Sequence, residues 1–284
     1  MRRNLYQEFY KLGHRKITWW SPIILLLLMV ITGYGIGYNE GKLLTVTNYN
    51  SPDWIILLLV VVGATTFSME FQNNAILTLL TKSPNKAIVY LSKYLVLFCY
   101  DCFLHAIAIL FTIGLRYAPL NSHVSWSTIY LYHEPLWENM LKTVGVDLLT
   151  TMFIISLVFL LSCLINSNAT VTIISLLIVF MGQFVSSSLL NYQDWLPLIK
   201  WNPFNMINLT REYYNYVTYY ATSQLSNAQL LTGTLCYTLL FVTLGYLIFR
   251  KNISNTTYLE DATMNQFPAQ LKSFANQLTR PRTT

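Results

Sequence analysis

Long apolar runs dominate the chain, and polar residues collect between them. An α-helix needs about 20 predominantly apolar residues to cross the hydrocarbon layer of a bilayer. Six runs approach that length, at residues 19–38, 54–69, 94–115, 144–164, 169–190 and 230–249. The second run is short unless it begins near Asn50, and Asp147 interrupts the fourth. The pattern predicts an all-α integral membrane protein with six transmembrane helices.

The composition agrees with a membrane class of protein. Hydrophobic residues make up 54% of the 284 positions and charged residues only 11%, whereas soluble domains carry about 25% charged residues. The net charge of +6 raises the question of nucleic acid, but the basic residues lie beside the apolar runs and no nucleic-acid-binding motif accompanies them. We therefore expect membrane lipid, and not nucleic acid, to surround this chain.

The distribution of basic residues predicts an orientation. If the N-terminus is cytoplasmic, 13 of the 18 Lys and Arg residues fall on the cytoplasmic side of the six spans. Cytoplasmic loops carry an excess of Lys and Arg, so both termini are expected in the cytoplasm. The outward connections are then residues 116–143 and 191–229, which are too short for a catalytic domain.

The N-terminal segment is basic and amphipathic. Leu5, Phe9 and Leu12 follow helical spacing, and five basic residues surround them: Arg2, Arg3, Lys11, Arg15 and Lys16. This pattern is typical of a helix that lies in the anionic headgroup layer before the first span. A plain basic flank of the first span is the alternative. No small-x-small cleavage pattern clearly ends the first apolar run, so we expect it to be retained.

The cytoplasmic connection between the second and third spans has the pattern of a short docking helix. Asn73 or Asn74 can cap its start, and the sequence Ser83-Pro84-Asn85 ends it. Its apolar ridge consists of Ile76, Leu77 and Leu80.

This arrangement resembles the membrane subunit of type-2 ATP-binding-cassette (ABC) exporters. The resemblance covers residues 1–250: a basic amphipathic N-terminus, a first span, and a loop from Glu70 to Lys93 with a Leu-rich helix and a Ser-Pro turn. It extends to the short connection at 165–168 and to Trp201-Asn202-Pro203-Phe204, in a region that often forms a re-entrant hairpin in that family. The resemblance implies a permease domain over 1–250 and a cytoplasmic tail over 251–284.

The resemblance also implies partners. The loop between spans two and three would be the coupling helix, contacting a nucleotide-binding subunit through Asn74, Ile76, Leu77 and Leu80, with Glu70 and Lys93 as loop charges. A second permease subunit, identical or different, would complete the transporter. No G-x-x-x-x-G-K-[ST] motif occurs in the chain, so ATP and magnesium are expected on the partner ATPase and no cofactor on this chain.

Two ionisable residues lie within the third span. Asp101 and His105 are four residues apart and therefore share a helix face. A charged Asp at mid-bilayer costs roughly 2.5 to 3.5 kcal/mol on insertion scales, so it should face the bundle interior. The pair either marks the translocation path or a gating hydrogen bond, or it is a satisfied interhelical bond.

No enzyme motif is present. His133-Glu134 lacks the second histidine of a metalloprotease helix, and no G-x-S-x-G pattern occurs. The four histidines stand in no metal-ligand spacing with cysteines or carboxylates. We therefore predict neither a catalytic residue nor a metal site.

The leading hypothesis is a multi-pass exporter subunit in a bacterial cell membrane, a source favoured by the frequent Asn and Tyr residues. A hydrophobic or amphipathic cargo is expected: a drug, a lipid or an antimicrobial peptide. The alternatives are a proton-coupled secondary transporter that uses Asp101 and His105 as a relay, and a non-transporting scaffold. The tail is expected to form an amphipathic helix from Pro268, carrying Leu271, Phe274 and Leu278, or to be a disordered polar segment.

Overall fold

The computed structural model describes the backbone of residues 2–36, 38–72, 85–118, 124–165, 167–192 and 195–278, and the side chains of these residues except 67–72 and 253–278. The described chain is helical, apart from one isolated β-bridge between Ile129 and Pro135. Its helices are α1 Arg2–Gly13, α2 Lys16–Ile36, α3 Gly41–Val46, α4 Ser51–Gln72, α6 Lys86–Leu115, η1 Leu131–His133, α7 Leu136–Leu164, α8 Asn168–Leu190, η2 Pro197–Trp201, η3 Asn205–Asn208, α9 Leu209–Tyr214, α10 Tyr216–Ser223 and α11 Asn227–Leu278.

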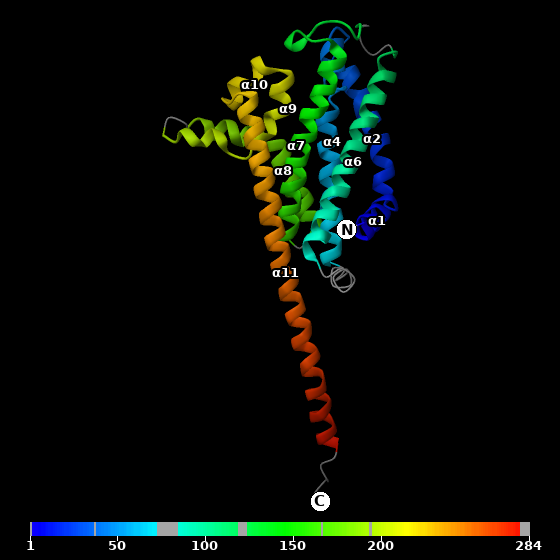
Figure 1. Cartoon of the computed structure of the whole chain (residues 1–284), viewed down its shortest axis with the longest axis vertical. Helices are drawn as coiled ribbons and strands as arrows, with labels where there is room; N and C mark the ends of the chain where they lie inside the picture. Colours follow the sequence, from blue (N-terminus) through cyan, green and yellow to red (C-terminus); the bar gives the residue numbers. More distant parts are fainter. Residues whose placement is uncertain are drawn as a thin grey trace, which may run out of the picture.

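The long helices form one upright bundle with α7 at its centre (Figure 1). Helix α7 packs against α4, α6, α8 and α11, and also against the short helices α3 and α9. More of its apolar stretch is buried than in any other candidate span, whereas α2, α8 and α11 are mostly exposed to the surroundings. The polar groups described below are therefore carried by the most enclosed helices.

Five helices in the described part of the chain are long and apolar enough to cross a membrane, at Lys16–Ile36, Lys86–Leu115, Leu136–Leu164, Asn168–Leu190 and Asn227–Asn252. They confirm a multi-pass, all-helical protein. Helix α4 has 22 residues and lies against α7, α8 and α6, but the side chains at its end are outside the described residues.

The helices begin earlier than the apolar runs predict. Helix α6 starts at Lys86, and α7 starts at Leu136. Asn85 caps α6 by accepting hydrogen bonds from the backbone amides of Ala87 and Ile88, at 3.0 and 3.3 Å. Turns that carry charged residues, such as Lys86 and Lys93 in α6 and Glu138 in α7, extend these helices beyond the apolar runs.

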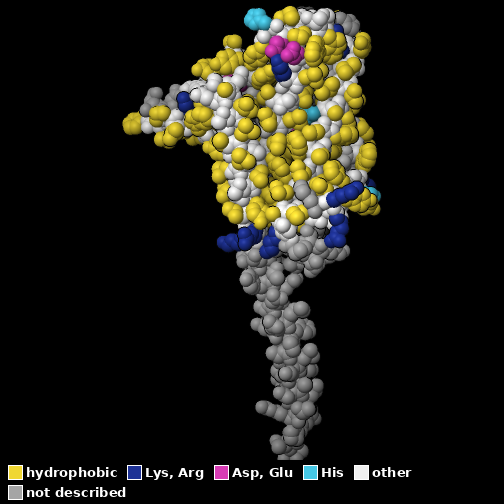
Figure 2. All heavy atoms as spheres, viewed as in Figure 1, with side chains coloured by type: hydrophobic (Ala, Val, Ile, Leu, Met, Phe, Trp, Pro, Cys, Tyr) yellow, Lys and Arg dark blue, Asp and Glu magenta, His cyan; other side chains and the backbone are white. Residues whose placement is uncertain are grey.

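Apolar side chains cover the sides of the bundle, as expected for a surface in contact with lipid tails (Figure 2). Lys and Arg side chains gather at the end of the bundle where α11 leaves it (Figure 2). The N-terminus and α1 lie at this same end, which we call the basic end (Figure 1).

Residues 2–13 form helix α1, as the basic amphipathic pattern predicts. Its buried residues are Asn4, Glu8 and Leu12, whereas Phe9 is 45% exposed. Glu8 takes an inward position because it pairs with a basic residue of α6, described below.

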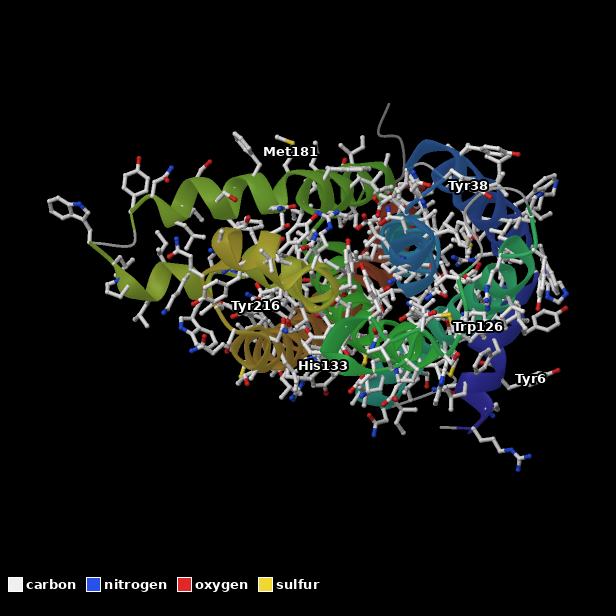
Figure 3. All side chains as sticks on the ribbon, turned by 90° about the horizontal axis from the view of Figure 1, so that it is seen from above. Tyr6, Tyr38, Trp126, His133, Met181 and Tyr216 are labelled. Atoms are coloured by element: carbon white, nitrogen blue, oxygen red, sulfur yellow. The ribbon has the colours of Figure 1, made fainter. Side chains whose placement is uncertain are left out.

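The chain between α8 and α11 consists of short helices. Seen from above, α9 and α10 lie between α8 and α11 at the end of the bundle opposite the N-terminus, while the end of α8 and η2 project sideways (Figure 3). The predicted Trp201–Phe204 segment joins η2 to η3. This part of the chain contacts α7, α8 and α11.

Helix α11 differs from the prediction of a separate tail helix. It runs without interruption from Asn227 to Leu278, so Pro268 lies inside the helix and does not begin one. Figure 1 shows it continuing well beyond the bundle. The last span and the tail as far as Leu278 are one continuous helix.

Candidate functional site

A cluster of three ionisable side chains lies in the bundle interior, between α6 and α7. His105 Nδ1 is 2.9 Å from Asp101 Oδ1, and His105 Nε2 is 2.9 Å from Asp147 Oδ2. All three side chains are buried. Asp101 and His105 share one face of α6, as their spacing predicts, and Asp147 reaches them from α7. We call these three residues the Asp-His-Asp cluster.

Threonine hydroxyl groups complete the cluster. Thr151 Oγ1 donates to Asp101 Oδ2 at 2.5 Å, and Thr210 Oγ1 donates to Asp147 Oδ1 at 2.9 Å. Thr150 Oγ1 lies 2.8 Å from Thr210 Oγ1. Because Thr210 belongs to α9, the cluster connects α6 and α7 to the short helices at the end of the bundle opposite α1.

The geometry constrains the protons of the cluster. A neutral imidazole has one N–H group and can donate through only one nitrogen, whereas the imidazolium ion donates through both. Both nitrogens of His105 lie within 3.0 Å of an acceptor oxygen, since Nδ1 also contacts the backbone oxygen of Asp101, so an imidazolium satisfies both contacts. Charges inside a bundle are costly unless they are paired, and here each carboxylate has both a histidine and a hydroxyl partner.

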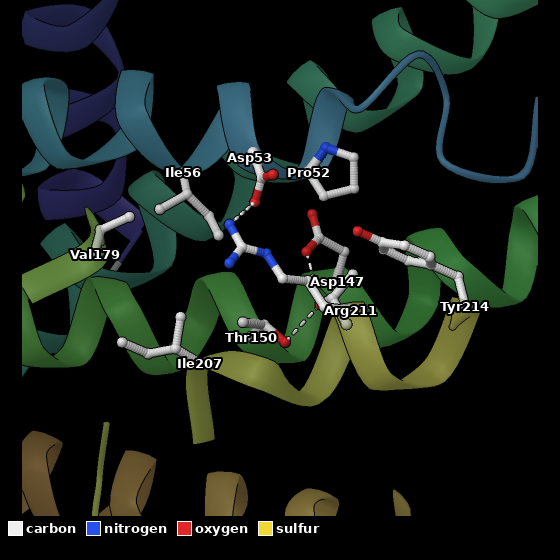
Figure 4. A pocket seen from close by; sticks show the side chains of 10 residues that line it. Pro52, Asp53, Ile56, Asp147, Thr150, Val179, Ile207, Arg211 and Tyr214 are labelled. Atoms are coloured by element: carbon white, nitrogen blue, oxygen red, sulfur yellow. Dashed lines mark hydrogen bonds and ion pairs between the residues drawn. The ribbon is translucent and has the colours of Figure 1, made fainter. Parts of the chain in front are cut away.

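A narrow pocket opens beside Asp147, between α4, α7, α8 and α9 (Figure 4). Arg211 reaches across it from α9: its Nη2 is 2.9 Å from Asp53 Oδ1 of α4, and its Nη1 donates to Gln183 Oε1 of α8 at 2.7 Å. Tyr214 and Pro52 also line the pocket, which has room for about one water molecule. Arg211 thus links α9 to α4 and α8.

A second buried ion pair lies at the basic end. Lys93 of α6 is fully buried, and its Nζ lies 2.8 Å from Glu8 Oε2 of α1. Lys11 Nζ contacts the other carboxylate oxygen of Glu8, also at 2.8 Å. Burial alone would raise the pKa of Glu8, but the two lysines hold this pKa below its ordinary value.

Some of the predicted site residues lie in the bundle interior, and others lie outside the described residues. Asp101 and His105 lie together in the interior, whereas Lys93 is not a loop charge but a buried residue of α6. Glu70 lies in α4, and its side chain is outside the described residues. The predicted coupling residues also lie outside them: Asn74, Ile76, Leu77 and Leu80.

Sequence reasoning missed the partners of these residues. In the sequence Asp147 only interrupts an apolar run, and no pattern marks Glu8, Thr210 or Arg211 as a partner of another residue. The sequence does contain a signal for Asp147, because it is an ionisable residue within a second apolar run. Ionisable residues inside a membrane commonly pair with one another. No sequence pattern identifies Glu8 as the partner of Lys93, because 85 positions separate them.

Neither a metal nor a catalytic constellation follows from this geometry. In the ranges with described side chains, no group of three or more His, Cys, Asp or Glu residues is arranged to hold a metal ion. The arrangement can connect helices and can hold or release a proton. Both capacities suit a protein that changes conformation in a membrane.

Comparison with known protein families identifies the chain's relatives. Residues 4–182 match the model of the ABC-2 family transporter proteins, which covers α1 to α7 and much of α8. No curated protein matches the chain significantly. In this family the membrane protein is the transport component, and it normally pairs with an ATP-binding subunit. The chain belongs to the ABC-2 family and is the membrane subunit, or permease, of an ABC transporter.

Proposed function

We propose that this permease is part of an exporter driven by ATP hydrolysis on a separate subunit. The match to the ABC-2 family over residues 4–182 carries this proposal. The missing G-x-x-x-x-G-K-[ST] motif supports it, because the phosphate-binding loop must then come from another chain. ATP and magnesium would bind that partner, and this chain would bind no cofactor.

The proposed topology has six spans, which are the five candidate spans and α4, and it places both termini in the cytoplasm. Two observations support it: α1 and the point where α11 leaves the bundle lie at one end, and basic side chains gather there (Figures 1 and 2). The short helices η2 to α10 would then lie on the outer side, where a re-entrant hairpin was expected. The membrane would be the cell membrane of a bacterium.

The segment 73–84 is proposed to contact the ATPase, through Asn74, Ile76, Leu77 and Leu80. It joins the end of α4 to the start of α6, and α6 begins at the basic end, where a cytoplasmic partner would bind (Figure 1). Movement of the ATPase would thus reach two helices of the bundle, and both contact the central α7.

The cargo is proposed to be hydrophobic or amphipathic, such as a drug, a lipid or an antimicrobial peptide. The support is physical: buried Lys93, His105 and Asp147 have ionisable partners, and the exposed side chains of α2 and α8 are largely apolar. Two permease copies, or two related permeases, would form the path between them.

Co-expression with an ABC ATPase from the same genome tests the proposal. We expect a stable complex whose ATP hydrolysis exceeds that of the ATPase alone. Leu77→Asp and Leu80→Asp should each abolish this stimulation while the permease still inserts, because a charge would disrupt the apolar ridge. Leu198→Asp, at an exposed position of η2, is the matched control and should have no effect. A permease that binds no ATPase would refute the proposal.

The Asp-His-Asp cluster favours one alternative, a proton-coupled carrier in which Asp101 and His105 relay protons. That function predicts transport of an amphipathic fluorescent dye into proteoliposomes by a pH gradient without ATP. The exporter predicts dye movement only with ATP and the partner subunit. A proteoliposome assay with each energy source separately distinguishes the two.

A further inference from the structure

The basic end contains a contact network that the family assignment does not explain. Glu8 and Lys93 form an ion pair with almost no exposure to the surroundings: the exposed fraction is 4% for Glu8 and 0% for Lys93. The pair joins the N-terminal helix α1 to α6. An exposed flank of a first span has no need for such a contact, because its charges would be solvated at the headgroup layer.

A second contact joins the same region to α4. Arg15 follows α1 directly, and its Nη1 donates to Thr65 Oγ1 at 3.2 Å and to Thr66 Oγ1 at 3.1 Å. The N-terminal region is therefore attached to two helices at once. Thr66 is six residues before the end of α4 at Gln72, which is about 9 Å along a helix axis.

The two anchoring points lie on either side of segment 73–84. Lys93 is seven residues after the start of α6, or about 10 Å along its axis. Helices α4 and α6 also pack directly against each other. Through Glu8 of α1 and through Arg15, the N-terminal region thus bridges the two helices that segment 73–84 connects along the chain.

The Glu8–Lys93 ion pair favours one position of α1 relative to α6. A buried ammonium group without its carboxylate is strongly unfavourable, so separation of α1 from α6 would leave a buried charge unpaired. An apolar contact could slide by one residue at small cost, whereas the ion pair favours one register. The bridge therefore keeps α1, the end of α4 and the start of α6 together while the rest of the bundle changes shape.

We propose that the buried Glu8–Lys93 ion pair, together with the contact of Arg15 to α4, makes α1, the end of α4 and the start of α6 one rigid unit that transmits ATPase movement to the bundle. Glu8 and Lys93 are then positioning residues for transport. This inference rests on the proposed function, because it takes segment 73–84 as the site of ATPase contact.

The test uses the full permease co-expressed with its ATPase and measures two quantities for each variant. The first is the amount of assembled complex, and the second is ATP hydrolysis per assembled complex relative to the ATPase alone. Glu8→Gln and Lys93→Gln should each reduce the second quantity by about fivefold or more. The exchanged pair, Glu8→Lys with Lys93→Glu, should recover activity to within about twofold of the wild type.

Lys142→Gln is the matched control. Lys142 also forms ion pairs with glutamates, at 2.6 and 2.9 Å from Glu134 and Glu138, but its side chain is 43% exposed and belongs to α7. It should leave ATP hydrolysis per complex unchanged. A purely structural role of Glu8 and Lys93 would lower the amount of complex and not the activity of each assembled complex.

The outcomes separate this inference from the proposed function. If the wild-type permease assembles with the ATPase but the variants hydrolyse ATP normally, the inference is wrong and the proposed function stands. If the wild-type permease forms no complex, both are wrong. If neither single variant assembles with the ATPase, the double variant Glu8→Gln with Lys93→Gln tests the inference. It removes both charges of the pair and so leaves neither of them buried without its partner. Normal ATP hydrolysis in that variant would overturn the inference.

Discussion

At the scale of single residues, the charged side chains of the interior illustrate how a membrane bundle accommodates ionisable groups. Both carboxylate oxygens of Asp147 are occupied, one by His105 and one by Thr210. The Asp101 carboxylate contacts His105 and Thr151. Asp101 and His105 share α6, whereas the contacts of Asp147 with His105 and Thr210, and of Thr151 with Asp101, connect different helices.

The first prediction concerns His105. His105→Ala should destabilise the protein by about 3 to 5 kcal/mol, because two buried carboxylates lose the cation between them. Thermal unfolding in mild detergent measures the effect. His133→Ala is the control, since His133 is exposed in η1, and it should leave the melting temperature unchanged. Similar melting temperatures for both variants would contradict a stabilising role of the cluster.

The second prediction concerns pH and Glu8. The lysines hold the pKa of Glu8 in the folded protein below the ordinary value of 4.5, even though burial opposes them. A lowered pKa means that the ion pair contributes its full stability above pH 4.5 and loses it as the pH falls through the folded-state pKa. The difference in melting temperature between the wild type and Glu8→Gln should therefore shrink on acidification. A difference that stays constant between neutral and acidic pH would refute this assignment.

At the scale of elements, α11 passes unusually close to α6 and α7. A Cβ atom at Gly245 would meet the hydroxyl group of Tyr90 and would lie 3.6 Å from the backbone Cα of Leu160. Tyr90 in turn packs against Phe249 of α11, with ring centroids 5.6 Å apart. Small residues at helix crossings allow this kind of approach in membranes.

The third prediction tests this crossing. Gly245→Leu should cost about 1 to 3 kcal/mol, because the added side chain has to displace Tyr90 and separate the helices. The matched control is Gly145→Leu in α7, where an added Cβ would meet nothing within 4 Å. Thermal unfolding of both variants compares the two positions. Equal effects would show that helix propensity, and not packing, governs the substitution at Gly245.

At the scale of the whole molecule, the two ends of the bundle differ in chemistry. Basic side chains gather at the end that holds α1 (Figure 2), and the short helices η2 to α10 lie at the other (Figure 1). The Glu8–Lys93 pair contacts α6 near its start, whereas the Asp-His-Asp cluster lies near its middle.

The fourth prediction tests the orientation. In a variant without native cysteines, a cysteine at Ser127 should react with a membrane-impermeant maleimide in intact cells, because Ser127 is exposed in the outward connection. A cysteine at Lys251 should react only after the membrane is permeabilised. Labelling of Lys251→Cys in intact cells would place the C-terminal end of α11 outside and contradict the proposed topology.

Local properties of the sequence were sufficient for the class of protein and for much of the fold. Apolar runs of span length predict transmembrane helices because the bilayer requires about 20 apolar residues for each crossing. The resemblance to the membrane subunit of type-2 ABC transporters, based on the order of such local features, is confirmed by the family match. The shared face of Asp101 and His105 follows from helical spacing alone.

Only the tertiary structure decided which residues meet. Asp147 joins His105 across 42 positions, and Glu8 joins Lys93 across 85. The resemblance implied that Lys93 is a loop charge, because a pattern of local features cannot reveal a buried partner on another helix. The sequence by itself determined the spans and their basic end, since these depend on each segment's own interaction with the bilayer. The contacts that bind the spans together depend on packing between distant segments, and these emerged only from the folded bundle.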